Sequence, residues 1–324
     1  FDFKYFLSKK KFFFMFALVF FVYIGALFSG PVVSNDDQIK YNARNIYLPF
    51  GLGFSVGSDS GNYMRVANDP KLIFEKERFV NGRELVPGNV AISRPAFLYL
   101  TYLISKPIDL ILKQTKIFND NLVNNIEDSL NTGYQVLGVK QTINDSLGDL
   151  KKYYSTYAAF LLLNFFVIFL SFYFYSKTTN VKILNFDSFS KSSLWLGVFL
   201  IINDITKKYI VSPNPAIFNL IAVTLTLYFC SILRTNGKLN LLWMAFIFGI
   251  CNLFYEVFIC PLLTIYVIYI KIELEKKKSF FDIAKLISFS SLFFLFPYLV
   301  WIITVEFFFG GYSHYGIDSF PGFN

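Results

Sequence analysis

The acids best suited to chemistry lie in one polar stretch of an otherwise apolar chain, residues 57–70 (GSDSGNYMRVANDP). The stretch carries Asp59 and, near its end, Asp69. A carboxylate can act as a general base when it lies within hydrogen-bond reach of the proton it removes. Asp59 is therefore the candidate general base of this chain.

Other interpretations of these acids stay open. Asp59 follows a Gly-Ser pair, so it can instead cap the amino terminus of a helix over residues 60–68. Asp36 and Asp37 lie nearer to the first apolar segment and are alternative candidates for the base. They can also be hydrated loop acids.

The composition is that of an integral membrane protein. The chain has 324 residues, of which 55% are hydrophobic and 16% charged, and its mean hydropathy is +0.49. The net charge of +8 comes from lysines beside apolar segments, which indicates membrane orientation rather than a nucleic-acid partner. With one histidine, His314, the sequence excludes a His-rich metal site and disfavours catalysis by a Cys/His or Ser/His pair. No cofactor follows from the sequence: a divalent metal stays open, but no motif supports one.

The apolar runs predict the membrane segments. Residues 12–29 are long enough to cross a bilayer, and the preceding Lys9, Lys10 and Lys11 put the amino terminus in the cytoplasm. Further apolar runs lie at 154–175, 192–204, 216–233, 240–255, 257–272 and 284–306. The run 96–112 is ambiguous because Lys106, Pro107 and Asp109 interrupt it.

The basic clusters resolve this ambiguity. These clusters are the run KIELEKKK (271–278), residues 234–238 and the lysines between 177 and 191. They all fall in the cytoplasm only if 96–112 lies at the membrane surface. We therefore predict an all-α polytopic protein with about seven crossings. Its single domain has four parts. They are a first transmembrane helix (12–29), an extracytoplasmic loop with juxtamembrane helices (30–153), a helix bundle (154–306) and an extracytoplasmic tail (307–324). Because the sequence starts at Phe1 and ends without a closing helix, we also expect it to be a fragment.

This order of features resembles the GT-C superfamily of membrane glycosyltransferases, which includes protein O-mannosyltransferases and aminoarabinose transferases. In that pattern, an outer loop carries an acid, then a Tyr and an Ala on a juxtamembrane helix, then an Arg-Pro before a second one. The corresponding residues here are Asp59, Tyr63, Ala67 and Arg94-Pro95, followed by AFLYLTYLI.

Two later stretches extend the resemblance. The stretch SPNPAIFNL has Asn214 where the family often has an acid, which puts a family role for that position in doubt. The stretch FGICNLFYEVFICPLLTIY has Glu256 at a turn between two helices. The resemblance covers about residues 20–300, and it is carried by the order and spacing of the motifs together.

The resemblance implies a transferase of the plasma (inner) membrane that uses a polyprenyl-phosphate sugar as donor. The acceptor would be a glycan, a lipid or a protein, and the active site would be extracytoplasmic. Asp59 would be the base, and Arg94 would bind the phosphate of the leaving group, because Arg offers two parallel hydrogen bonds. Tyr63, Lys207, Lys208 and Glu256 are the other candidate substrate-binding residues. Arg94 and the two lysines can equally anchor the chain among lipid headgroups.

Two other classes of function remain. A transporter or flippase of lipid-linked intermediates should show broken or charged helices paired across an internal repeat, and the sequence has no such repeat. A non-catalytic membrane subunit would leave the acids and Arg94 scattered over the structure.

Overall fold

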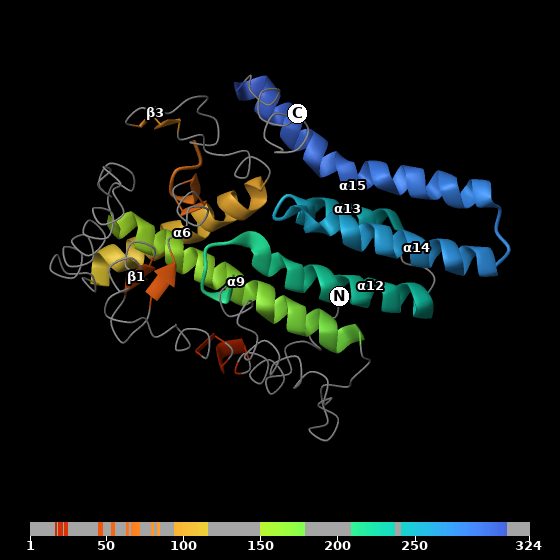
Figure 1. Ribbon diagram of the computed structural model, residues 1–324, viewed down its shortest axis with the longest axis horizontal. Helices are drawn as coiled ribbons and strands as arrows, with labels where there is room; N and C mark the ends of the chain where they lie inside the picture. Colours follow the sequence, from red (N-terminus) through yellow and green to blue (C-terminus); the bar gives the residue numbers. More distant parts are fainter. Residues whose placement is uncertain are drawn as a thin grey trace.

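The computed structural model describes six long helices and several short segments (Figure 1). The described residues are 17, 19–21, 23–24, 45–47, 53–55, 63–64, 66–71, 79–80, 83–84, 94–115, 150–178, 209–236 and 241–309. The long helices are α6 (Pro95–Thr115), α9 (Leu150–Thr178), α12 (Phe218–Asn236), α13 (Leu241–Asn252), α14 (Ile259–Glu275) and α15 (Phe280–Phe309). Two short 3-10 helices, η4 (Pro215–Ile217) and η5 (Glu256–Phe258), precede α12 and α14.

The helices identify a polytopic membrane protein. Within the described ranges, five helical segments are long and apolar enough to cross a bilayer, since about 20 apolar residues suffice. They are Pro95–Leu112, Ser155–Tyr175, Pro215–Leu233, Glu256–Glu275 and Phe280–Val305. The apolar runs predicted at 96–112, 154–175, 216–233, 257–272 and 284–306 are helical, whereas the predicted crossing 240–255 forms only the shorter helix α13, which ends at Asn252. The run 192–204 lies outside the described residues, and the described positions between 17 and 24 are helical.

Helix α6 differs from the other long helices in its direction. It packs along α9, and Figure 1 shows it crossing α9 obliquely, whereas α12, α14 and α15 extend away from it toward the other end of the bundle. The backbone N–H of Ala96 at its start donates to the carbonyl of Leu253, 3.2 Å away, at the end of α13. The first turn of α6 is thereby fixed against the turn that joins α13 to α14.

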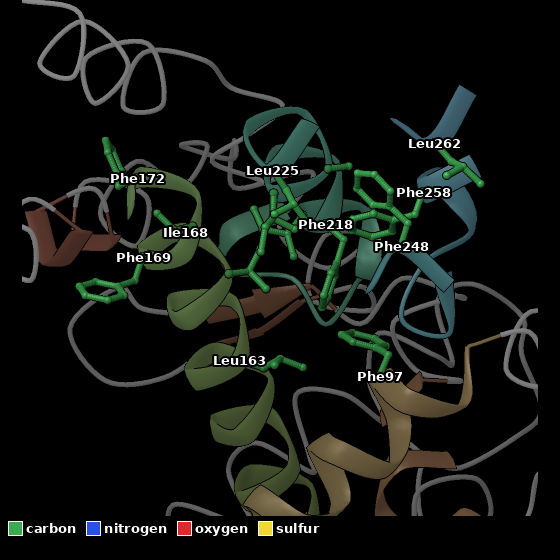
Figure 2. Packing of buried hydrophobic residues seen from close by; sticks show 14 of the residues in the cluster. Phe97, Leu163, Ile168, Phe169, Phe172, Phe218, Leu225, Phe248, Phe258 and Leu262 are labelled. Atoms are coloured by element: carbon green, nitrogen blue, oxygen red, sulfur yellow. The ribbon is translucent and has the colours of Figure 1, made fainter. Parts of the chain in front are cut away.

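Aromatic side chains fill the core where α6, α9 and α12 meet (Figure 2). The ring of Phe97 on α6 lies 5.0 Å from that of Phe160 and 5.9 Å from that of Phe218, both measured between centroids. Phe218 in turn stacks on Phe254 at 5.3 Å. Tilted and edge-to-face ring pairs of this kind stabilise a core beyond the area they bury, so α6 is held against the bundle by packing as well as by its backbone contact.

Helices α13 and α15 approach closely at Gly249. A Cβ atom at this position would collide with the backbone carbonyl oxygen of Phe294 and lie 3.1 Å from its Cα. Gly249 therefore lets the two backbones come together, as small residues do between membrane helices.

Three buried side chains hold the non-helical segment before η4. The amide nitrogen of Asn164 lies 3.0 Å from the carbonyl oxygen of Ile210 and 3.1 Å from that of Ser212. The hydroxyl of Tyr157 donates to the carbonyl of Val211 at 2.8 Å. The hydroxyl of Tyr23 lies 2.6 Å from the carbonyl oxygen of Leu161 on α9 and 3.2 Å from that of Ile210, so it lies between α9 and this segment. Buried carbonyl groups that no regular helix satisfies need such donors.

Short strands depart from the all-α prediction. The predicted outer loop contains two short antiparallel hairpins, β1 (Asn45–Tyr47) with β2 (Gly53–Ser55) and β3 (Phe79–Val80) with β4 (Arg83–Glu84).

Two ion pairs stabilise the turn between α14 and α15. The buried carboxylate of Glu273 pairs with Lys276 at 2.8 Å and with Lys278. The hydrogen bond to Glu273 raises the pKa of Lys278.

Candidate functional site

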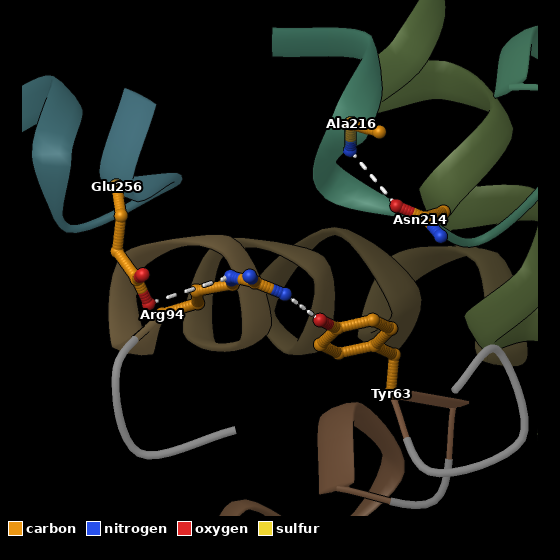
Figure 3. Close-up of polar contacts among 5 residues, drawn as sticks. All are labelled: Tyr63, Arg94, Asn214, Ala216 and Glu256. Atoms are coloured by element: carbon orange, nitrogen blue, oxygen red, sulfur yellow. Dashed lines mark hydrogen bonds and ion pairs between the residues drawn. The ribbon is translucent and has the colours of Figure 1, made fainter. Parts of the chain in front are cut away.

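The candidate site is built around the guanidinium of Arg94, the residue directly before α6 (Figure 3). Its Nη1 donates a hydrogen bond to the hydroxyl of Tyr63. Its Nε lies 4.0 Å from Oε1 of Glu256, the first residue of η5. Three of the predicted substrate-binding residues, from three separate segments of the chain, therefore meet at one cation.

Two aromatic rings flank the same cation. The Cζ atom of Arg94 lies 4.9 Å from the ring centroid of Tyr255 and 5.7 Å from that of Tyr63. A guanidinium over an aromatic face is attracted by the ring quadrupole. Sequence reasoning missed Tyr255, which directly precedes Glu256.

The elements around Arg94 determine where it lies. The Ala96–Leu253 hydrogen bond joins the start of α6 to the end of α13, one turn before Tyr255 and Glu256. On the other side, the ring of Tyr63 meets that of Phe97 edge to face at 5.8 Å. Arg94 is thus positioned by the contacts of Ala96 and Phe97, two and three residues further along the chain.

Exposure differs sharply between the members of the site. Tyr63 is buried, the Arg94 side chain is 16% exposed, and the Glu256 side chain is 55% exposed. The cation is therefore fixed by the fold while its counterion reaches solvent. The 4.0 Å separation between Arg94 and Glu256 is longer than a direct hydrogen bond, so the pair is a loose one. A phosphate or carboxylate could replace Glu256 beside the guanidinium and make closer, charge-assisted hydrogen bonds.

Asn214 has a structural task in this part of the molecule. Its side-chain oxygen accepts a hydrogen bond from the backbone N–H of Ala216 at 2.9 Å and so caps η4 (Figure 3). An amide oxygen serves this purpose as well as a carboxylate does. The departure from an acid at Asn214 therefore has a local physical reason.

Several predicted site residues lie outside the described part of the chain. They are Asp36, Asp37, Asp59, Lys207 and Lys208. Tyr63, four residues after Asp59, is helical and buried, and Tyr209 directly follows Lys208. Asp69, at the end of the same polar stretch as Asp59, is exposed, and its carboxylate accepts from the backbone N–H of Lys71 at 3.3 Å.

The described ranges contain no group of three His, Cys, Asp or Glu side chains that could hold a metal ion.

The comparisons with known proteins assign no family or function to this chain. No protein-family model, no curated protein and no solved structure matches this chain.

Proposed function

We propose that this protein is a membrane glycosyltransferase, resembling the GT-C superfamily, that moves a sugar from a polyprenyl-phosphate donor to an acceptor on the extracytoplasmic face of the plasma (inner) membrane. The observation that carries the proposal is the convergence of Tyr63 and Glu256 on the guanidinium of Arg94. A lipid-phosphate leaving group needs a cation that is already in place, because such a group is stabilised by preorganised charge.

The reaction we propose is a single displacement. The acceptor hydroxyl or amide attacks the anomeric carbon of the donor, and the bond from that carbon to the phosphate oxygen breaks. The phosphate leaves with the bonding electrons beside Arg94, and the proton of the acceptor passes to the carboxylate of Asp59. Asp59 precedes Tyr63 by one helical turn in sequence. Asp36 and Asp37 are the alternative bases, and Lys207 and Lys208 are further candidates for the phosphate.

The other classes of function are supported less well. A non-catalytic subunit predicts that Arg94 and the candidate acids scatter; of these acids the structure describes Glu256, which lies 4.0 Å from Arg94, while Asp36, Asp37 and Asp59 lie outside the described residues. A transporter or flippase predicts charged groups along a path through the bundle. Arg94 and Glu256 lie together at the end of the bundle where α6 meets the α13–η5 turn.

Sugar transfer in membranes tests the proposal. Wild type, Asp59→Asn, the Asp36→Asn/Asp37→Asn double variant and Arg94→Lys would each be supplied with polyprenyl-phosphate sugars. We expect Asp59→Asn to lose about a hundredfold or more in rate, as removal of a general base does. Asp69→Asn is the matched control, since that exposed acid lies ten positions along the same stretch, and it should keep wild-type activity.

The outcomes separate the alternatives. Loss of activity in the Asp36/Asp37 double variant with a fully active Asp59→Asn would move the base toward the first helix. A wild type that transfers sugar from no polyprenyl-phosphate donor would contradict the proposed function itself.

A further inference from the structure

The turn between α14 and α15 gathers lysines at the other end of α14 from the Arg94 site (Figure 1). Between positions 271 and 285 the chain carries five lysines and three acids, and one of the acids, Glu273, is buried. The lysines are all exposed, and they are Lys271, Lys276, Lys277, Lys278 and Lys285. The surface of this turn is therefore positively charged.

The buried carboxylate of Glu273 fixes two of these lysines. Its side chain is 4% exposed, and it pairs with Lys276 at 2.8 Å and with Lys278. The side chains of the two lysines are about half exposed, so both still reach the surface. Two ammonium groups at one carboxylate leave an excess positive charge at a defined place, and a phosphate can bind there through charge-assisted hydrogen bonds.

The backbone of the turn presents a third lysine between these two. The N–H of Lys278 donates to the carbonyl of Glu273 at 3.1 Å, and that of Lys277 to the carbonyl of Leu274 at 2.9 Å. This pair of bonds is a Schellman motif, which ends a helix with one residue in the left-handed region. Lys277 occupies that place with a φ of 58°, where glycine is usual. The geometry of the turn therefore does not account for a lysine at this position.

Two exposed rings follow the lysines directly. Phe280 and Phe281, the first residues of α15, are 71% and 75% exposed. The turn joins the candidate spans Glu256–Glu275 and Phe280–Val305, so the lysines and the rings lie at one boundary of the membrane. Lysines beside phenyl rings suit the headgroup region, where ammonium groups meet phosphates and rings enter the acyl boundary. A soluble anion would use the lysines and leave both rings in water.

We propose that the α14–α15 turn is a binding site for the headgroups of anionic phospholipids. The lysines pair with the lipid phosphates, and Phe280 and Phe281 insert beside them into the acyl boundary. The positive charge matches the negative surface of the cytoplasmic leaflet, the side that we predict for this turn. Orientation by positive charge alone requires only a number of lysines, whereas this site requires lysines beside the two rings. The inference is independent of the proposed sugar transfer.

The test is photolabelling of the full-length chain in phosphatidylcholine vesicles that contain a minor fraction of photoreactive phosphatidylglycerol. Its photoreactive group lies at the top of an acyl chain, and mass spectrometry measures the label on the peptide 271–285. We expect competition by unlabelled phosphatidylglycerol and little by zwitterionic phosphatidylethanolamine. The triple variant Lys271→Gln/Lys277→Gln/Lys285→Gln keeps the Glu273 pairs and should lower the label about tenfold or more, since each lysine near an anionic surface contributes about fivefold.

A second triple variant, Lys71→Gln/Lys106→Gln/Lys177→Gln, is the matched control. It removes the same charge at exposed positions of other segments, and it should keep the label on 271–285. Phe280→Ser/Phe281→Ser keeps all the lysines and should lower the label, because the rings no longer enter the acyl boundary. Thermal unfolding in detergent checks that each variant folds, and the competition in wild type tests the proposal without any variant.

Three results would overturn the proposal. Equal loss of label in the two triple variants would show that net charge alone attracts the lipid. Equal competition by phosphatidylethanolamine and phosphatidylglycerol would show that the turn does not select anionic headgroups. Stronger competition by soluble inositol hexakisphosphate than by phosphatidylglycerol vesicles would identify a site for a free phosphate instead of a lipid.

Discussion

Arg94 and Glu256 face each other across the junction of α6 with the α13–η5 turn, with Nε of the one 4.0 Å from Oε1 of the other. The arginine is largely covered and the glutamate is largely open. An anion that arrives from solvent therefore meets a fixed cation whose contact with Glu256 is loose. We expect such an anion to compete with Glu256 for the guanidinium of Arg94.

This relationship predicts opposite effects for two substitutions on the binding of polyprenyl phosphate. Glu256→Gln removes a competing charge and should tighten binding about two- to fivefold, the worth of an exposed ion pair. Arg94→Lys loses the planar fork and the contact with Tyr63, and should weaken binding about tenfold or more. Equilibrium binding of the lipid phosphate to purified protein in nanodiscs measures both. Weaker binding by Glu256→Gln would mean that Glu256 supports the anion site instead of competing for it.

The predicted topology can be tested by side-specific labelling of single cysteines. In a background without Cys230, Cys251 and Cys260, Lys277→Cys in the α14–α15 turn should react only from the cytoplasmic side. Lys106→Cys, on the exposed face of α6, should react only from the outside, because we predict that α6 lies at the surface. Protection of Lys106→Cys from both sides, together with reaction of Lys277→Cys from the outside, would show that α6 spans the membrane.

Asn164→Leu should destabilise the protein by about 1–3 kcal/mol, since it leaves buried carbonyl groups without a donor. Thermal unfolding in detergent, followed by intrinsic fluorescence, measures the change. Tyr157→Phe is the companion variant, because it removes one hydrogen bond to Val211 while keeping the ring, and it should cost about 0.5–1.5 kcal/mol. An Asn164→Leu variant as stable as wild type would show that the Asn164 hydrogen bonds do not contribute to holding the segment before η4.

Gly249→Ala should destabilise the protein by about 1–3 kcal/mol through overpacking against Phe294. The direction of the change in stability tests the close approach of the two helices, because Gly→Ala in an unconstrained helix interior instead stabilises a protein by up to about 1 kcal/mol. Ile247→Ala, at a 37% exposed position of the same helix, controls for changes of side-chain volume and should be nearly neutral. Stabilisation by Gly249→Ala would show that α13 and α15 can separate at this point without cost.

Much of the membrane architecture was predictable, because a helix in a bilayer must satisfy its own backbone and therefore leaves a long apolar run in the sequence. The runs that became α9, α12, α14 and α15 follow this rule. The approach of Arg94 to Glu256 was only implied by the resemblance, since no local pattern states which distant segments meet. The contact of Asn164 with the segment before η4 is of the same kind, and no spacing in the sequence points to it.

The hairpins are a different case, because the signal was present and was not used. The residues between β3 and β4 are Asn81 and Gly82, the pair that most strongly favours a two-residue hairpin turn. Tyr255 was missed because a tyrosine beside an apolar helix has an ordinary role as an interfacial residue, and only the geometry shows its ring against Arg94.

The length of α13 has a consequence for the shape of the membrane around the protein. Its 12 residues rise about 18 Å, whereas the hydrocarbon core of a bilayer is about 30 Å thick. If α13 returns from one face of the bundle toward the other, hydrophobic mismatch must be met by local thinning of the bilayer or by sinking the end that carries Leu253 below the headgroups. Leu253 is the residue that anchors the start of α6. In the second case Arg94 would occupy a recess below the headgroup plane, and an amphiphile would have to descend into it before its phosphate could be bound.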